Sequence, residues 1–171
     1  MKFETPYRHS RANEAVSVVT LSAEEQTRKV HDAVARRAYQ ISETSKDEGH
    51  HELQDWLQAE SDLVHPFCVG RMPIDGSLWL GTDADAFAEG TIEVWVAPRQ
   101  LTVCGNPRTG SRTLSPGQRF SSDQRIYEVI NLPVEVDPSR VAARVNCSAL
   151  EILLRKAECE KESGQRLKMA A

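Results

Sequence analysis

One segment near the C-terminus decides the fold class: Leu132-Pro-Val-Glu-Val-Asp137-Pro-Ser-Arg-Val141-Ala-Ala-Arg-Val145-Asn-Cys-Ser-Ala149-Leu-Glu-Ile152-Leu-Leu154-Arg-Lys156. Apolar side chains recur at every second position, first over 141–145 and again over 150–154. A period of two is the signature of half-buried β-strands. Pro133 and Pro138 precede the first run, where a residue without an N–H does not interrupt a central ladder. The segment therefore predicts two strands joined by a short polar turn.

Similar runs precede this segment along the chain. Alternation at 78–80, 92–96, 101–105 and 126–132 predicts further strands, whereas residues 106–123 are rich in Gly, Pro, Ser, Thr and Arg and predict a loop. Short strands separated by turn signals are typical of a β-sandwich. We therefore predict an immunoglobulin-like sandwich over residues 68–157, followed by a C-terminal tail over 158–171.

The N-terminal part of the sequence lacks the two-residue alternation. Residues 1–21 show no sustained period and predict a mobile arm with an apolar patch at Val16–Val19. Ser22 and Glu25 have the spacing of a helix capping box, and apolar residues follow at helical spacing up to Ile41. A second helical pattern contains Trp56, Leu57 and Leu63 and stops before Pro66. The prediction is an αα-hairpin over 22–65, with Val34, Ala38, Trp56, Leu57 and Leu63 buried together, and an α+β chain overall.

The C-terminal segment resembles the closing strands of the α-crystallin domain of small heat-shock proteins. The positions that match the family pattern are Leu132, Pro133, Ala143, Leu150, Ile152, Leu154 and Lys156. The runs at 92–96 and 101–105 resemble the family's paired strands that end in Leu-x-Ile-x-Gly. Departures occur at 147–149, at Arg155 and at Glu128, which stands where the family usually has an arginine. The resemblance indicates a divergent member of the family.

The hairpin carries a second resemblance. Ala35-Arg-Arg-Ala-Tyr39, Gly49-His50 and Asp55-Trp-Leu-Gln-Ala-Glu60 resemble a short two-helix module that occurs in many bacterial proteins and has no assigned function. This resemblance supports the predicted hairpin and a bacterial origin, and it implies no mechanism.

Composition restricts the function classes. A formal net charge of −4 argues against a nucleic-acid partner. No apolar run is long enough to cross a bilayer, and the first residues lack the apolar stretch of a secretory signal. We therefore expect a soluble, cytoplasmic protein. In a reducing compartment, isolated cysteines such as the four in this chain are usually small buried hydrophobic residues, and a disulfide or a regulatory thiol is the less common alternative.

No enzymatic constellation is recognisable. Adjacent His50 and His51 have no spaced third ligand, and Asp83-x-Asp85 lacks the Gly and Glu that a calcium loop needs. All five histidines precede the predicted sandwich, so a β-domain active site would lack the usual general base. We predict a non-enzyme with no catalytic residue, no metal and no cofactor.

The family resemblance implies an ATP-independent holdase chaperone of the stress response. Its partners would be unfolded or partly folded client proteins, and its assembly a homodimer or small oligomer. By resemblance, clients would bind the Val16–Val19 patch and a groove between two strands, at Leu101, Val103, Leu150, Ile152 and Leu154. The alternative is a non-enzymatic adapter, like co-chaperone domains of the same fold, in which the hairpin would supply partner specificity. Both hypotheses require an exposed apolar surface, and neither requires a catalytic residue.

Overall fold

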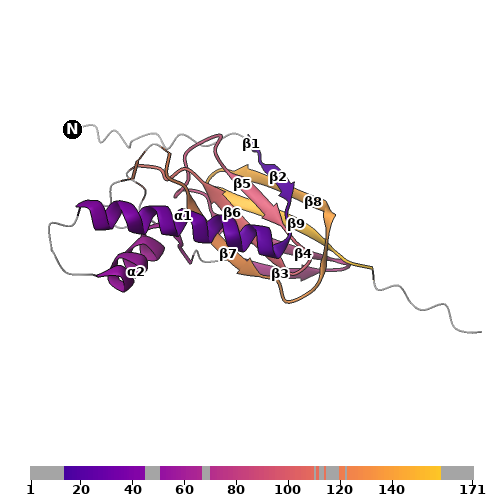
Figure 1. The fold of residues 1–171 in the computed structure, drawn as a ribbon. Coiled ribbons are helices and arrows are strands. Elements are labelled where there is room, and N and C mark those ends of the chain that lie inside the picture. The colour runs from indigo at the N-terminus through magenta and orange to yellow at the C-terminus, as the bar shows by residue number, and fades with distance from the viewer. Residues whose placement is uncertain are drawn as a thin grey trace, which may run out of the picture.

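The structure of the protein is a computed structural model that describes residues 14–44, 51–66, 70–109, 111, 114, 120–121 and 123–158. Its helices and strands follow in this order: β1 (Glu14–Ala15), β2 (Ser17–Thr20), α1 (Ala23–Thr44), α2 (Glu52–Leu63), β3 (Gly70–Ile74), β4 (Ser77–Asp83), β5 (Glu93–Val96), β6 (Gln100–Gly105), β7 (Ile126–Asn131), β8 (Val136–Asn146) and β9 (Ala149–Lys156). Figure 1 shows α1 running across the strands, with α2 beside it.

Two sheets face each other. The five-stranded sheet has the order β1-β8-β9-β4-β3, and the four-stranded sheet has the order β2-β5-β6-β7. All pairs are antiparallel except β2 with β5, which is parallel. The predicted α+β class, with a helical pair followed by a β-sandwich, is confirmed.

The main core lies between the sheets and follows the alternation in the sequence. On β9, Leu150, Ile152 and Leu154 point inward, whereas Leu153 on the same strand is exposed. On the opposite sheet, Leu101 and Val103 of β6 meet them in the same hydrophobic cluster. Every predicted strand is present, because each had one apolar face to bury.

The N-terminal segment corrects the predicted mobile arm of residues 1–21. Residues 14–20 form β1 and β2, while residues 1–13 lie outside the described residues. β1 pairs with β8 of one sheet, and β2 pairs with β5 of the other. Val16 and Val18 pack against the main core. Backbone pairing with two open sheet edges, together with burial of these valines, orders a segment too short to be stable alone.

The capping box is confirmed at the start of α1. The Ser22 N–H donates to Glu25 Oε2 over 3.0 Å, and the Glu25 N–H donates to Ser22 Oγ over 3.2 Å. Each side chain thus satisfies an N–H that the first turn of the helix leaves without an intrahelical partner.

The hairpin buries its apolar side chains against the sandwich as well as within itself. Val34 and Leu63 are buried, and Ala38 and Trp56 are partly buried, in one cluster that also contains Trp95, Cys104 and Tyr127 of the four-stranded sheet. The predicted burial of Leu57 is wrong, because 54% of it is exposed. An amphipathic pattern shows which residues share a face, but only the packing partner decides how wide the buried stripe is.

The domain boundaries at 22–65 and 68–157 stay predictions, although the shared cluster joins the hairpin to the four-stranded sheet. Of the predicted tail, only residue 158 belongs to the described part of the chain. No helix within the described ranges is long and apolar enough to cross a membrane.

Candidate protein-binding face

An apolar row crosses the outer face of the five-stranded sheet. Met72 pairs with Trp79, Trp79 pairs with Leu153, and Leu153 pairs with Ala142. Residues directly opposite each other on antiparallel strands share a face, so these four side chains lie side by side across β3, β4, β9 and β8. We call Met72, Trp79, Leu153 and Ala142 the apolar row.

The row is accessible to solvent. Met72 is 54% exposed and Leu153 is 39% exposed, while Trp79 is half-buried. Ile74, at the end of β3, adds a further exposed apolar side chain next to the row. Single exposed hydrophobic residues are ordinary, whereas several in register form a contiguous patch of the kind that marks interaction sites.

Two hollows flank Trp79. One has a volume of about 510 Å³ and the other about 500 Å³. The first is lined by Ile74, Trp79, Ala142, Ala143, Arg144, Glu151 and Leu153. The second is lined by Trp79, Gly81, Thr82, Asp83, Asn146, Cys147, Ser148 and Ala149. The indole of Trp79 thus divides a concave surface into two recesses.

Gly81 permits this position of the indole. The Trp79 ring lies over Gly81, and a Cβ added at that glycine would collide with the ring. Gly70 of β3 is also close to the ring, at an ordinary contact distance. The absence of a side chain at 81 therefore leaves room for the indole, which lines both hollows.

One ion pair lies beside the row. Arg144 Nε donates to Glu151 Oε2 over 2.7 Å, and both residues line the first hollow. A paired arginine and carboxylate contribute no net charge to the rim.

The five predicted site residues do not form an exposed groove. Leu101, Val103, Leu150, Ile152 and Leu154 are at most 1% exposed and belong to the core between the sheets. Their expected exposure is corrected, because they are on the inward faces of β6 and β9. The edges of β5 and β8, where a groove between the sheets would open, are paired with β2 and β1.

Thr102 and Glu128 are both buried, although polar residues on strands are usually exposed to solvent. Thr102 is on the outer face of β6 but is buried beneath α1, where its Oγ1 donates to Gln26 Oε1 over 2.8 Å. Glu128 is buried on β7 and accepts a hydrogen bond from Thr82 Oγ1 of the other sheet over 3.3 Å. The departure from the family arginine at Glu128 is thus accommodated inside the sandwich.

Sequence reasoning missed β3 and with it Met72 and Ile74 of the exposed patch. Pro73 within Gly70–Ile74 obscures the strand, since proline is confined to edges of sheets. A usable signal was present in Asp75-Gly76, a dipeptide typical of two-residue hairpin turns. Gly76 has φ of 67°, and Ile74 pairs with Ser77 across this turn.

Two motifs could have supplied metal ligands, His50-His51 and Asp83-x-Asp85, of which the first is described only in part. His50 lies outside the described residues, and Asp85 is paired with Arg108 Nη1 over 2.6 Å. Among the described residues, no group of three His, Cys, Asp or Glu side chains is arranged to hold a metal ion.

Comparison with known proteins found structural likenesses only. No family model and no curated protein sequence matches the chain. Among solved structures, heat shock protein 16.0 from Schizosaccharomyces pombe is 17% identical, with a TM-score of 0.42, and the match covers 63% of this chain and 98% of that one.

Two bacterial structures give similar values. A small heat-shock protein from Xylella fastidiosa is 16% identical over 63% of this chain and 98% of its own, with a TM-score of 0.44. The hspA protein from Xanthomonas axonopodis is 23% identical over 54% of this chain and 93% of its own, with a TM-score of 0.41. These likenesses concern the fold alone.

Proposed function

We propose that this protein is an ATP-independent holdase that binds apolar segments of unfolding proteins on the outer face of its five-stranded sheet. The observation that carries the proposal is the apolar row, exposed across four strands and flanked by two hollows. The resemblance of residues 132–156 to the α-crystallin pattern supports the same function.

The physical basis is burial of apolar surface. Removing apolar area from water contributes about 25 cal/mol per Å², which is enough to compete with self-association of a client when several side chains are covered together. A wide, shallow, apolar surface suits many sequences, because it imposes no specific hydrogen-bond pattern on the ligand. Cytoplasmic location, and assembly as a homodimer or small oligomer, are part of the proposal.

The edge of the same sheet offers a second mode of contact. β3 is the edge strand next to β4, and all five of its residues are exposed. An extended client segment could add to such an edge through main-chain hydrogen bonds. Pro73 removes one donor and so limits this pairing, which leaves the side chains of the row as the principal contact.

The test is suppression of client aggregation. The purified chain should reduce heat-induced aggregation of unrelated proteins without ATP, and Met72→Asp and Leu153→Asp should weaken this protection at least several-fold. Val129→Asp is the matched control, because Val129 is 40% exposed, as Leu153 is, but lies on the other sheet. Circular dichroism verifies that all three variants stay folded. A folded wild type that protects none of several clients at molar excess would refute the proposal.

A specific observation favours the adapter as the second candidate. The hairpin leaves Tyr39, Leu53 and Leu57 exposed. These side chains could serve a dedicated partner while the sheet face plays no part. A monomer or dimer of defined native mass that gives no protection would favour the adapter. Protection that Leu53→Asp leaves intact and Leu153→Asp removes would favour the holdase.

A further inference from the structure

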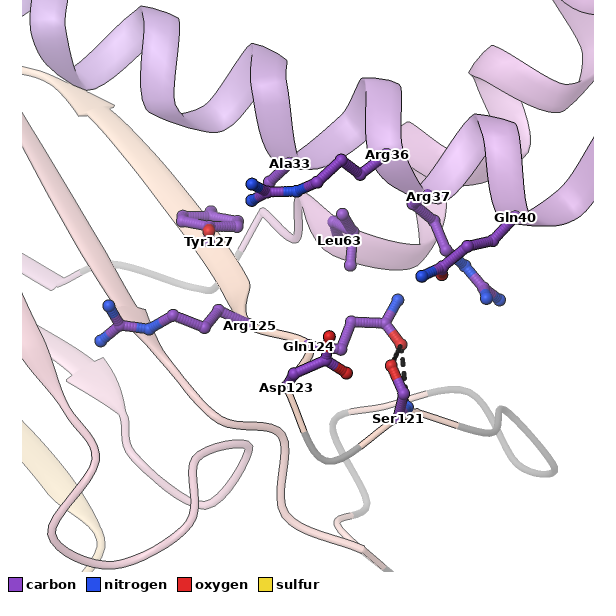
Figure 2. Close-up of a pocket in the computed structure, with 10 residues that line it drawn as sticks. All are labelled: Ala33, Arg36, Arg37, Gln40, Leu63, Ser121, Asp123, Gln124, Arg125 and Tyr127. Carbon is purple, nitrogen blue, oxygen red and sulfur yellow. Dashed lines mark hydrogen bonds between the residues drawn. The ribbon is translucent and has the colours of Figure 1, made fainter.

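A small cleft separates the hairpin from the residues that lead into β7. It has a volume of about 120 Å³, and its lining includes Arg36, Arg37, Asp123, Gln124, Arg125 and Tyr127. Figure 2 shows that α1 supplies arginines from above, while the segment 121–125 supplies polar side chains from below. The proposed function makes no use of this cleft.

Gln124 has an unmet hydrogen-bond donor at the cleft. Only 8% of the residue is exposed, and its Oε1 accepts the Ser121 N–H over 3.1 Å, which fixes the orientation of the amide. Its Nε2 is buried and has no hydrogen-bond partner among the residues that the structure describes. In Figure 2 this nitrogen points toward the helices, with Leu63 and Gln40 on either side. A buried donor without a partner is destabilising, so the position favours a ligand that brings an acceptor.

The arginines around the cleft are not equivalent. Arg37 donates twice to Asp62 Oδ2, over 2.9 and 2.7 Å, and Arg125 Nη1 is 3.1 Å from Glu93 Oε2. Arg36 makes no ion pair or hydrogen bond with any described residue. Its guanidinium extends beside Tyr127 (Figure 2). One cation at this cleft is therefore available to an anion.

Asp123, at the rim of the cleft, carries a negative charge that would repel an anion. It is exposed, and hydrogen bonds from Ser121 and within its own residue lower the pKa of its carboxyl, with a smaller contribution from the charge of Arg36. Because Asp123 faces solvent, its repulsion of a ligand is screened by water and salt. Asp62 and Glu93 are held by their own arginines.

We propose that this cleft binds one small oxyanion, a phosphate or carboxylate group, with the buried Gln124 Nε2 as its fixed donor and the exposed Arg36 guanidinium, reoriented from its place beside Tyr127, as the second donor. A cleft of about 120 Å³ has room for a single such group. Amide and guanidinium N–H groups are the donors that oxyanions take in proteins. Because Arg36 belongs to α1 and Gln124 to the sandwich, the bound anion would join the hairpin to the sheet.

Side-chain amide resonances of the full chain provide the test. Sodium phosphate and, separately, sodium acetate are titrated at constant pH and ionic strength, with sodium chloride as the balancing salt. Saturable shifts of the Gln124 Nε2 resonances are expected with at least one anion. The same anion should raise the folded-to-unfolded ratio about 100-fold at 100 times its Kd. The two arms distinguish phosphate from carboxylate.

Variants identify the donors. Gln124→Leu and Arg36→Gln should each lower the affinity at least tenfold, whereas Arg71→Gln, an equal charge change on the exposed strand β3, should leave it unchanged. If Gln124→Leu fails to fold, Gln124→Glu preserves the size and replaces the donor with a repelling carboxylate. The proposal is overturned if neither anion gives saturable shifts, or if binding survives both Arg36→Gln and a folded Gln124 variant.

Discussion

The two outer faces of the sandwich present similar side chains to different surroundings. On the four-stranded sheet, Trp95 points outward, is covered by the hairpin and donates through Nε1 to Glu93 Oε2 over 3.0 Å. On the five-stranded sheet, Trp79 also points outward, but it lines two hollows whose lining contains no residue of α1 or α2. Lys29 of α1 places its Nζ 5.7 Å from the ring centroid of Trp95. The comparison shows that an outward tryptophan becomes core or surface depending on where a helix packs.

The tryptophan pair gives the largest expected effect. Trp95→Ala should lower the free energy of unfolding by about 3–5 kcal/mol, the usual cost of truncating a buried large aromatic side chain. Trp79→Ala should cost only about 1–2 kcal/mol, because less of its area is removed from water, and should weaken client protection. Urea unfolding monitored by circular dichroism measures both. Equal costs would mean that the two faces do not differ as described.

Thr102 tests how tightly α1 is held to the covered face. Thr102→Val removes the donor to Gln26 Oε1 and leaves that buried oxygen with only the longer contact from Gln100 Nε2, at 3.4 Å. The expected loss is about 1–2 kcal/mol. Thr20→Val is the control, since Thr20 is exposed and its own hydrogen bond is long, at 3.4 Å. A similar loss in both variants would remove Thr102 as a special link between helix and sheet.

A thiol on the covered face links stability to pH. Burial raises the pKa of Cys104 from 9.0 to about 12, with Glu93 adding to the rise and Arg125 opposing it. Between pH 9 and 12 the unfolded thiol loses its proton first, so the unfolded state binds fewer protons and stability falls as pH rises. The contribution is at most about 1.4 kcal/mol per pH unit.

Cys104→Ala should therefore make the loss of stability above pH 9 less steep than in the wild type. Burial also raises the pKa of Tyr127, which contributes the same sign of effect in both proteins. Cys147→Ala, in the exposed turn, serves as the control and should keep the wild-type slope. Parallel stability curves for wild type and Cys104→Ala would contradict the assignment.

The smallest effect is expected at the end of the uncovered face. Cys147, in the β8–β9 turn, has φ of 58°, a conformation that side-chain-bearing residues other than Asn and Asp rarely adopt. Cys147→Asn should raise the free energy of unfolding by up to about 1 kcal/mol, and Cys147→Val should lower it. Thermal unfolding ranks the three proteins. An asparagine variant less stable than the valine variant would show that backbone strain does not govern this turn.

Much of the fold could be predicted because it follows from local patterns. Alternation identified β4 to β9, and the Ser22–Glu25 capping box marked the start of α1. β1 and β2 were not predicted, because strands of two and four residues have little pattern of their own and depend on the edges they pair with. β3 was not predicted because Pro73 is unfavourable within a strand, although Asp75-Gly76 is typical of the hairpin turn that follows it.

The candidate site was harder to predict for a physical reason. Alternation on β9 placed Leu150, Ile152 and Leu154 on one face of the strand and Leu153 on the other. It did not show which face would pack in the core and which would stay exposed. The register of β3, β4, β9 and β8 then aligned four side chains from distant parts of the sequence into one row. Register depends on pairing between strands and leaves no mark within a single strand.

The sequence by itself determined the order of elements, the helical hairpin ahead of the sandwich and the two-residue period of each strand. These properties arise from interactions between residues close along the chain. Only the tertiary structure decided that the hairpin covers Trp95 and leaves Trp79 exposed, and that residues 14–20 occupy the edges of both sheets. Such choices depend on how much apolar area each packing arrangement removes from water, a quantity set by the assembled surfaces and not by any one segment.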